Sequence, residues 1–245
     1  MKAMIFAAGL GTRLKPITDT MPKALVPVCG QPLLCHVITK LVAAGYDDII
    51  VNVHHFPDQI IDYLCINDFG VHITVSDERD FLRETGGGIK HVRSLLESSP
   101  FLVHNVDIIS NLDLKWLREQ HKADALATIV VSERETQRYF LFDEEGRLKG
   151  WTNVKTGEVR SPFGDIDPSQ YRKLAFAGIH LMSPAIFDAF DKLGFGDRFS
   201  ITDFYLKACA EYPIYAAVPP GFKMVDVGKK ETLSEAERVC ESILQ

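Results

Sequence analysis

The sequence predicts a single α/β domain, with a Rossmann-like, mostly parallel sheet covered by helices on both faces. Three observations carry this prediction. Short apolar runs alternate with amphipathic segments through the first half of the 245-residue chain. Several of these runs are continuously apolar, which is typical of parallel strands buried on both faces. No internal repeat or low-complexity segment interrupts the series, and regular strand–helix alternation favours a parallel sheet.

The first elements follow this alternation closely. The run AMIFAAG at 3–9 predicts a buried strand, and QPLLCHVITKLVAAG at 31–45 predicts a helix, with Pro32 near its start and Gly45 as its stop. The next elements are a strand at 47–55, a helix at 57–65, a strand at 71–78, a glycine-rich turn, a helix at 89–96, a strand at 100–107, a helix at 112–123 and a strand at 125–133.

The alternation loosens after about Ser132. RYFLFDEEGRLKGWTN at 138–153 predicts a hairpin that turns at Glu145-Gly146, and the polar stretch 154–172 predicts a surface excursion. The last elements are a strand at 173–183, a helix around 184–190, a helix capped by Ser200 or Thr202, and a closing strand, glycine turn and helix at 222–244.

Composition excludes several classes of protein. A net charge of −6 argues against broad electrostatic binding to nucleic acid, and no apolar run reaches the roughly 20 residues that a membrane span needs. We therefore expect no nucleic acid or membrane partner. The five cysteines are odd in number, scattered and never in a CxxC pair. This pattern indicates reduced thiols in the cytoplasm rather than disulfides or a zinc site.

The stretch FAAGLGTRLKPITDTMPKAL at 6–25 holds the strongest functional signal. A Walker A loop would need GxxxxGK followed by Ser or Thr, and a dinucleotide fingerprint would need GxGxxG with an acidic residue after the second strand, where this chain has Val-His-His at 53–55. Both templates fail. What remains is a nest of backbone N–H groups at Gly9 and Gly11, with Arg13 and Lys23 as cations. Spacing alone leaves this phosphate cradle and a plain tight turn equally open.

The motif GLGTRLKPITDTMPKAL at 9–25 resembles the GxGTRL-x-P-x-T-x-x-x-PK signature of the sugar-1-phosphate nucleotidyltransferases, and the resemblance extends along nearly the whole chain. ETGGGI at 84–89 is similar to the form found in N-acetylmuramate-1-phosphate uridylyltransferases and mannose-1-phosphate guanylyltransferase-like proteins. NVDIISNLDL, FAGIHLMSPAIFD and VDVGKKETLSEAE resemble further parts of the family pattern. Val106 and Met224 depart from it, since the family has glycine and often tryptophan there.

The resemblance implies a nucleotide-diphospho-sugar transferase fold over residues 1–245, with a nucleotide-binding half at 1–132 and a sugar-phosphate-binding half at 133–245. It implies transfer of a nucleotidyl group from a nucleoside triphosphate, UTP first and GTP next, to a sugar 1-phosphate with release of pyrophosphate. Arg13 and Lys23 would be catalytic, Lys23 and Gly178 would bind the sugar phosphate, and Asp107 and Asp226 would hold Mg²⁺. The implied nucleotide-binding set is Ala8, Gly9, Leu10, Gly11, Thr12, Arg13, Glu84, Thr85, Gly86 and Asn105.

Other interpretations stay open at this point. Taken alone, Asp107 and Asp226 each suit a strand exit or turn cap, Glu84 suits a solvated loop, and Gly178 suits a packing position. Within the enzyme class, a phosphocholine-type cytidylyltransferase is the alternative, with Tyr139, Phe140 and Trp151 as candidates for an aromatic cage around choline. From another class, a catalytically silent nucleotide-binding regulatory subunit is the alternative, which a turnover assay separates from an enzyme.

Overall fold

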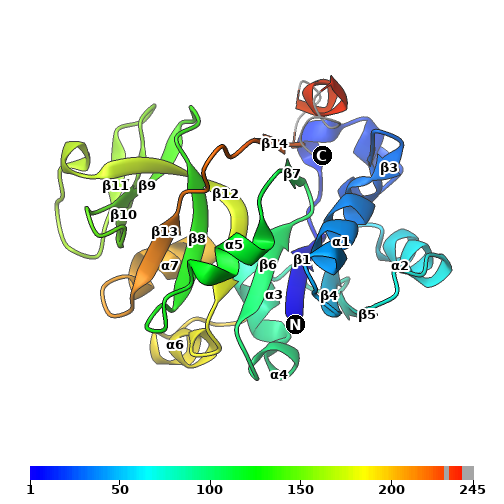
Figure 1. The fold of residues 1–245 in the computed structure, drawn as a ribbon, viewed down its shortest axis with the longest axis horizontal. Helices are drawn as coiled ribbons and strands as arrows, with labels where there is room; N and C mark the ends of the chain where they lie inside the picture. The colour runs from blue at the N-terminus through cyan, green and yellow to red at the C-terminus, as the bar shows by residue number, and fades with distance from the viewer. Residues whose placement is uncertain (229–231, 239–245) are drawn as a thin grey trace. The chain divides into compact units, whose positions relative to one another are not determined.

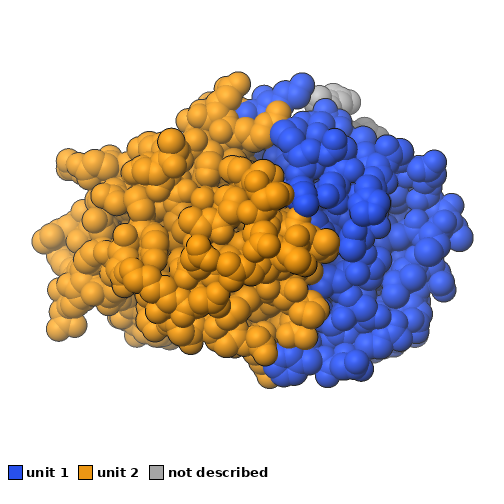
Figure 2. Space-filling model, turned by 90° about the horizontal axis from the view of Figure 1, so that it is seen from below, with its two compact units in different colours: residues 1–82, 102–115, 221–245 blue, residues 83–101, 116–220 orange. Residues whose placement is uncertain are grey.

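The computed structural model describes residues 1–228 and 232–238. The chain divides into two compact units, which Figure 2 colours separately. The first unit contains Met1–Leu82, Leu102–Lys115 and the described part of Gly221–Gln245, and the second contains Arg83–Phe101 and Trp116–Pro220. The boundaries of these units follow from packing and carry no information on what each unit binds. The division at residue 132 into a nucleotide-binding half and a sugar-phosphate-binding half therefore stays a prediction.

The first unit is built on a parallel sheet with the strand order β5-β4-β1-β6. Figure 1 shows helices α1 and α2 alongside these strands. Two short antiparallel ladders complete the unit, β2 with β3 and β7 with β14. The bounds are β1 Lys2–Phe6, β2 Pro27–Val28, β3 Gln31–Pro32, α1 Leu33–Ala43, β4 Asp48–Val53, α2 Pro57–Ile66, β5 His72–Asp77, β6 Phe101–Asn105, β7 Ile108–Ser110 and β14 Met224–Asp226, with residues 232–238 also helical.

Local sequence explains these elements. On α1, the apolar positions recur at helical spacing and are buried: Leu33, Leu34, Val37, Ile38 and Leu41 are each at most 2% exposed. Pro32 precedes the first turn, and Gly45 follows the helix at a φ of 86°, a left-handed conformation that glycine adopts without steric cost.

The second unit is mainly antiparallel. Its strand order is β11-β10-β9-β12-β8-β13, and only the pair of β8 and β13 is parallel. The predicted hairpin at Glu145-Gly146 joins β9 to β10, and Ser200 caps α7 by accepting from Thr202 N. The bounds are α3 Glu84–His91, α4 Arg93–Leu96, α5 Leu114–Glu119, β8 Ala127–Ser132, β9 Arg138–Phe142, β10 Leu148–Asn153, β11 Glu158–Arg160, β12 Arg172–Met182, α6 Ile186–Lys192, α7 Ile201–Ala208 and β13 Ile214–Ala217.

The predicted fold class is therefore confirmed, and one local prediction is wrong. The glycine-rich segment of residues 86–88 is part of helix α3 rather than a turn. A Cβ on Gly86 would lie 2.2 Å from the Phe199 ring, and one on Gly87 would lie 2.3 Å from the carbonyl oxygen of Asp197. Close packing thus overrides the low helix propensity of glycine. The stretch at 154–172 lies at the surface, as predicted, and it also contains β11, which pairs with β10.

The cysteine prediction needs one correction. Cys35, Cys65 and Cys209 are free thiols, but Cys29 is disulfide-bonded, so the expectation of reduced thiols is wrong at Cys29. Disulfide connectivity cannot be deduced from sequence spacing alone. Cys240 lies outside the described residues. Across residues 1–228 and 232–238, no helix is both long and apolar enough to cross a bilayer.

Candidate active site

The parallel sheet of the first unit has a point where the strand order reverses. The chain passes from β1 outward to β4 and β5, then returns to β6 on the other side of β1. In open α/β sheets, ligands bind outside the carboxyl ends of the strands at this point. Phe6 pairs with Asn105, and Val106 N donates to Phe6 O at 3.2 Å. The opening loop after β1 and the segment with Asp107 after β6 therefore leave neighbouring strands at the same edge of the sheet.

A buried asparagine fixes the start of the opening loop. Asn52, on β4, is 2% exposed, and its Oδ1 accepts from the backbone N of Ala7 at 2.9 Å and of Ala8 at 3.3 Å. Asn52 Nδ2 in turn donates to Oε1 of Glu78 at 3.0 Å, and Glu78 is 3% exposed. The amide thereby orients two backbone groups that follow β1, and its own orientation is set by the carboxylate.

The loop then doubles back at Gly11. Gly11 has a φ of 64°, and its carbonyl oxygen accepts from Leu14 N at 2.9 Å and from Thr18 Oγ1 at 2.8 Å. A Cβ at this position would lie 2.8 Å from Thr18 Cγ2 and 3.2 Å from Lys23 Cβ. Both the left-handed backbone and the close approach require glycine here. Residues 9, 10 and 12 remain exposed on the loop, as a ligand cradle needs.

Lys23 lies beneath this turn. It is 9% exposed, and its ammonium forms an ion pair with Oδ2 of Asp107. An ammonium buried this deeply would destabilise the fold without a carboxylate partner. The structure therefore joins the cation of the opening loop to the carboxylate that follows β6.

The ladder of β7 and β14 brings the second carboxylate to the same place. Asp226 pairs with Ile108, the residue after Asp107, and Val227 N donates to Asp107 O at 2.8 Å. This register places Asp107 opposite Val227, one residue along the chain from Asp226. Asp107 and Asp226 are thus adjacent, although they are far apart in the sequence.

The side chain of Arg13 lies next to Gly228, two residues after Asp226. A Cβ on Gly228 would lie 2.7 Å from Asp226 Oδ1 and 2.9 Å from Arg13 Nη2. The guanidinium and the carboxylate therefore both flank Gly228, where any side chain would displace one of them. Arg13, Lys23, Asp107 and Asp226 converge within the first unit, with Ala8 to Thr12 on the adjoining loop and Asn105 at the end of β6.

The donor set suits a divalent cation. Two carboxylates from adjacent strands offer the hard oxygen ligands that Mg²⁺ prefers, and substrate phosphates commonly supply the rest. Among the described residues, no group of three or more His, Cys, Asp or Glu side chains lies together as a metal site. The role of Asp107 and Asp226 as metal ligands stays a prediction.

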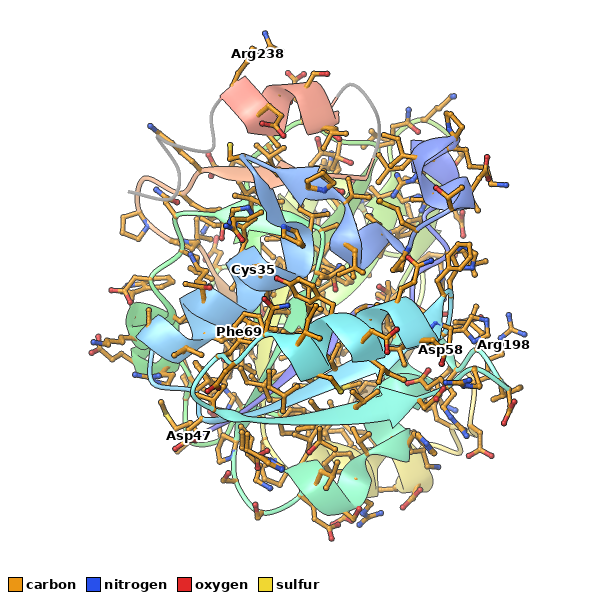
Figure 3. All side chains as sticks on the ribbon, turned by 90° about the vertical axis from the view of Figure 1, so that its right-hand side faces the viewer. Cys35, Asp47, Asp58, Phe69, Arg198 and Arg238 are labelled. Carbon is orange, nitrogen blue, oxygen red and sulfur yellow. The ribbon has the colours of Figure 1, made fainter. Side chains whose placement is uncertain are left out.

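The remaining predicted site residues lie in the second unit. Glu84 has a φ of 61° and accepts from Arg198 Nε at 3.1 Å, Thr85 Oγ1 accepts from Ile201 N at 2.8 Å, and Gly86 N donates to Phe199 O at 2.9 Å. These contacts hold the start of α3 against the 198–201 segment, and Figure 3 labels Arg198. Their nucleotide-binding roles stay predictions.

Gly178 lies on β12 at a φ of 73°, within the stretch where the register with β8 shifts between Phe176 and His180. Such a bulge leaves a residue outside the ladder, so it can aim backbone groups at a ligand. This placement suits the predicted sugar-side role, which stays a prediction.

With this geometry established, the chain can be compared with known proteins. A family model described as "Nucleotidyl transferase" matches residues 2–242. The chain belongs to the nucleotidyl transferase family. This confirms both the resemblance inferred from the sequence and the prediction of an enzyme.

Relatives of this nucleotidyl transferase carry informative names. The chain is 33% identical over 248 residues to the N-acetylmuramate alpha-1-phosphate uridylyltransferase of Caulobacter vibrioides, covering 98% of this chain and 97% of that one. It is 30% identical over 249 residues to the mannose-1-phosphate guanylyltransferase 1 of Arabidopsis thaliana, covering 94% of this chain and 62% of that one.

Solved structures support the fold. HddC from Yersinia pseudotuberculosis, solved with GMP-PN, matches with a TM-score of 0.76 at 24% identity, covering 97% of this chain and 98% of that chain. A UDP-glucose pyrophosphorylase complexed with UDP-glucose matches with a TM-score of 0.76 at 18% identity, covering 98% of each chain. At these identities the likeness shows that the nucleotidyl transferase shares their fold.

Sequence reasoning missed three residues of this candidate site. Asn52 had a detectable signal, because it is the one amide in the apolar run IIVNV at 49–53. Glu78 and Gly228 had none, since their importance depends on contacts with Asn52, Arg13 and Asp226.

His104 introduces a pH dependence next to the nucleotidyl transferase site. It is fully buried on β6, and its Nδ1 lies 2.8 Å from Asn105 O. Burial lowers the pKa of His104 to about 4. The nearby charge of Lys40 also lowers this pKa, whereas the hydrogen bond to Asn105 and the charge of Asp107 raise it. The imidazole is therefore neutral in the folded protein near neutral pH.

We expect the free energy of unfolding to fall as the pH falls from about 6.5 toward 4. In this window the unfolded chain binds a proton at residue 104 that the folded chain does not, so protonation favours unfolding. The loss from this one group is about 2 kcal/mol between pH 7 and pH 5. Urea denaturation of the native protein and His104→Gln at both values measures it.

The His104→Gln variant should lose about 2 kcal/mol less than the native protein on acidification, whatever its stability at pH 7. His72→Gln is the control, because the side chain of His72 is 73% exposed. Equal losses in the native protein and His104→Gln would contradict the assignment.

Proposed function

We propose that the protein transfers a nucleotidyl group from a nucleoside triphosphate, UTP in preference to GTP, to a sugar 1-phosphate and releases pyrophosphate. The observation that carries this proposal is the convergence of Arg13, Lys23, Asp107 and Asp226 at the carboxyl ends of β1 and β6. The Caulobacter vibrioides relative, matched along nearly its whole length, supports UTP as the first donor to test and N-acetylmuramate 1-phosphate as the first acceptor.

The reaction we propose is an in-line displacement. A phosphate oxygen of the sugar 1-phosphate attacks the α-phosphorus of the triphosphate, the bond to the β-phosphate oxygen breaks, and pyrophosphate leaves with that electron pair. Both reactants are anions, so positioning and charge neutralisation dominate over acid–base chemistry. No covalent nucleophile on the protein is required.

Each residue has a defined part in this mechanism. The loop amides at Leu10, Gly11 and Thr12 would hold triphosphate oxygens, and the Arg13 guanidinium would bind the charge that develops on them. Lys23 would hold phosphate oxygens where the two substrates meet. Asp107 and Asp226 would hold Mg²⁺, which when bound neutralises phosphate charge and orients the phosphates.

The ion pair of Lys23 and Asp107 bears on this assignment. When phosphate oxygens arrive, the ammonium gains new anionic partners, and the Asp107 carboxylate becomes available to a cation. The pair therefore keeps both charges compensated while no substrate is bound, which lowers the cost of burying them.

The phosphocholine alternative loses its proposed cage. Tyr139 and Phe140 are adjacent on β9, so their side chains point to opposite faces of the sheet. Phe140 pairs with Trp151 across the ladder but is 3% exposed and packs against Phe142 and Phe176. These three aromatic residues therefore do not surround one site in this structure, and a cytidylyltransferase would need a different choline pocket.

Base choice is tested by a panel of four nucleoside triphosphates against several sugar 1-phosphates, read as pyrophosphate release. We expect the highest kcat/KM with UTP and the next with GTP. N-acetylmuramate 1-phosphate and mannose 1-phosphate are the acceptors favoured by the relatives' names. A clear preference for CTP would move the protein toward the phosphocholine-type branch. No turnover with any pair would favour the silent regulatory subunit.

A further inference from the structure

A concave region lies on the first unit, and the loop of residues 9–13 is not among the residues that line it. It is a cavity of about 570 Å³ on α1, next to the end of β7. Figure 3 labels Cys35, which is one of its lining residues, on α1. No role in the proposed reaction falls on the residues that line it: Gln31, Cys35, His36, Thr39, Lys40, Ala43 and Ser110.

Lys40 is the charged residue among those that line this cavity. Its side chain is half-buried, and Nζ donates to Ser110 O at 2.6 Å. Within the described residues, Lys40 forms no ion pair with a carboxylate, whereas the half-buried Lys2 and the buried Lys23 both do. An ammonium has three donors, so two remain for other acceptors.

The charge of Lys40 is incompletely compensated by the protein. Burial lowers the pKa of Lys40 to about 8, and the nearby charge of Asp113 offsets this only in part. His104, on β6, lies close enough for its own pKa to respond to the Lys40 charge, and it contributes no negative charge. An anion bound in the cavity would supply the missing compensation.

Ser110 contributes a second polar group at this cavity whose hydrogen bonding is incomplete. It is 2% exposed, and its hydroxyl has no hydrogen-bond partner in the part of the chain that the structure describes. A buried hydroxyl left in this state destabilises a fold. Ser110 lines the same cavity as Lys40, so one bound molecule could contact both residues.

We propose that this cavity is a binding site for a small molecule bearing an oxyanion, a carboxylate or a phosphate, held by Lys40 and Ser110. Thr39 and Gln31 are exposed at the cavity and can donate to further oxygens of the same molecule. The volume suits a metabolite-sized ligand rather than a single ion, since ligand pockets are commonly about 300–1,000 Å³.

The position of the cavity gives the site a regulatory consequence, and this step rests on the proposed function. Ser110 ends β7 and pairs with Met224, and the same ladder pairs Ile108 with Asp226 and follows Asp107 directly. A ligand that binds the Lys40 ammonium and breaks its hydrogen bond to Ser110 O would remove one of the contacts that hold β7 in this ladder. Ligand bound at the cavity and substrate bound at Asp107 and Asp226 are then coupled through two short strands.

Cys35 provides a local probe of occupancy. It is a free, half-buried thiol that lines the cavity, and the exposed Cys65 is an internal reference on the neighbouring helix. The rate of iodoacetamide labelling at each cysteine is measured by peptide mass spectrometry in the presence of citrate or inorganic phosphate. We expect at least one of these anions to slow Cys35 labelling about fivefold or more, with no change at Cys65.

Three variants show where the anion binds. Lys40→Met should abolish the protection of Cys35, Lys40→Arg should retain most of it, and Arg13→Ala should leave it unchanged. Unfolding midpoints within a few degrees of the native value establish that each variant is folded. No protection by either anion, or equal protection in Lys40→Met, would overturn the proposal. Protection lost in Arg13→Ala but kept in Lys40→Met would place the anion at the active site and would also overturn it.

This labelling result does not depend on turnover. If the protein proves to be a silent regulatory subunit, the proposed function fails while Cys35 protection persists. If protection is absent in an active enzyme, the cavity proposal fails alone. Turnover by Lys40→Met should respond less to added citrate than turnover by the native protein does, because the variant lacks the ammonium that the anion would bind.

Discussion

Arg13→Ala is expected to lower turnover by about two orders of magnitude or more, equivalent to about 2.7 kcal/mol of lost transition-state stabilisation. The physical reason is the place of the guanidinium. It lies against Gly228 beside Asp226, at the end of a loop whose backbone is fixed by Gly11 and Asn52. A positive charge held there acts on the phosphates at the moment when charge builds on the leaving pyrophosphate.

The measurement is pyrophosphate release at saturating substrates, with folding checked by the unfolding midpoint. Lys15→Ala is the matched control, because Lys15 is an exposed cation two positions away whose partner is Asp19. It should change turnover less than about twofold. Near-normal turnover in folded Arg13→Ala would show that Arg13 is only a surface cation.

The success of the sequence prediction differs between the two halves of the chain, and the reason is physical. In the first unit the longer elements β1, β4, β5, β6, α1 and α2 are specified by their own periodicity and by stop signals such as Gly45, so local reading is sufficient for them. In the second unit, α3 contains three glycines, and Phe199 and Asp197 pack against two of them, Gly86 and Gly87. That contact is made by residues more than a hundred positions away, and no window around 86–88 contains it.

The candidate site shows the same distinction. The turn at Gly11 follows from local sequence, because two glycines after a buried strand favour a left-handed turn. The adjacency of Asp107 and Asp226 depends on the ladder of β7 and β14, which are three residues each and lie at distant points of the chain. Strands this short carry almost no periodic signal, so the family resemblance alone could pair them.

The cavity on α1 illustrates a third situation. Lys40 belongs to the helix that the spacing of Leu33, Val37 and Leu41 predicts, and a lysine on such a helix is usually solvated. Its importance arises only when Ser110 places a carbonyl and a buried hydroxyl next to it. Neither residue has an unusual sequence context, so the site becomes visible only in three dimensions.

Asp107→Asn and Asp226→Asn are each expected to abolish most turnover and to leave the fold intact. Both carboxylates would hold the same Mg²⁺, so losing either one should lose the metal, and the double change should cost little more than a single one. EDTA should abolish turnover of the native protein, and Mg²⁺ or Mn²⁺ should restore it. Asp58→Asn is the control, since Asp58 is an exposed carboxylate on α2, labelled in Figure 3.

A readout independent of turnover makes this prediction sharper. Mn²⁺ binding, followed by electron paramagnetic resonance in the presence of a nucleoside triphosphate, should weaken at least about tenfold in each single variant and no further in the double one. The two variants differ in one respect, because Asp107→Asn also removes the ion-pair partner of Lys23 while Asp226→Asn keeps it. Asp107→Asn should therefore lower the unfolding midpoint more than Asp226→Asn does.

That difference separates two roles that Asp107 could have. If Asp107 served only to neutralise Lys23, then Lys23→Met would make the carboxylate dispensable, and Asp107→Asn in that background would not weaken Mn²⁺ binding further. If Asp107 holds the metal, Mn²⁺ binding in the Lys23→Met protein should still depend on Asp107, because the ligand oxygen is lost whether or not the ammonium is present. Additive losses in the Asp107 and Asp226 variants, or turnover that resists EDTA, would end the shared-metal proposal. The adjacency of Asp107, which precedes β7, and Asp226, which ends β14, would then need a purely structural explanation.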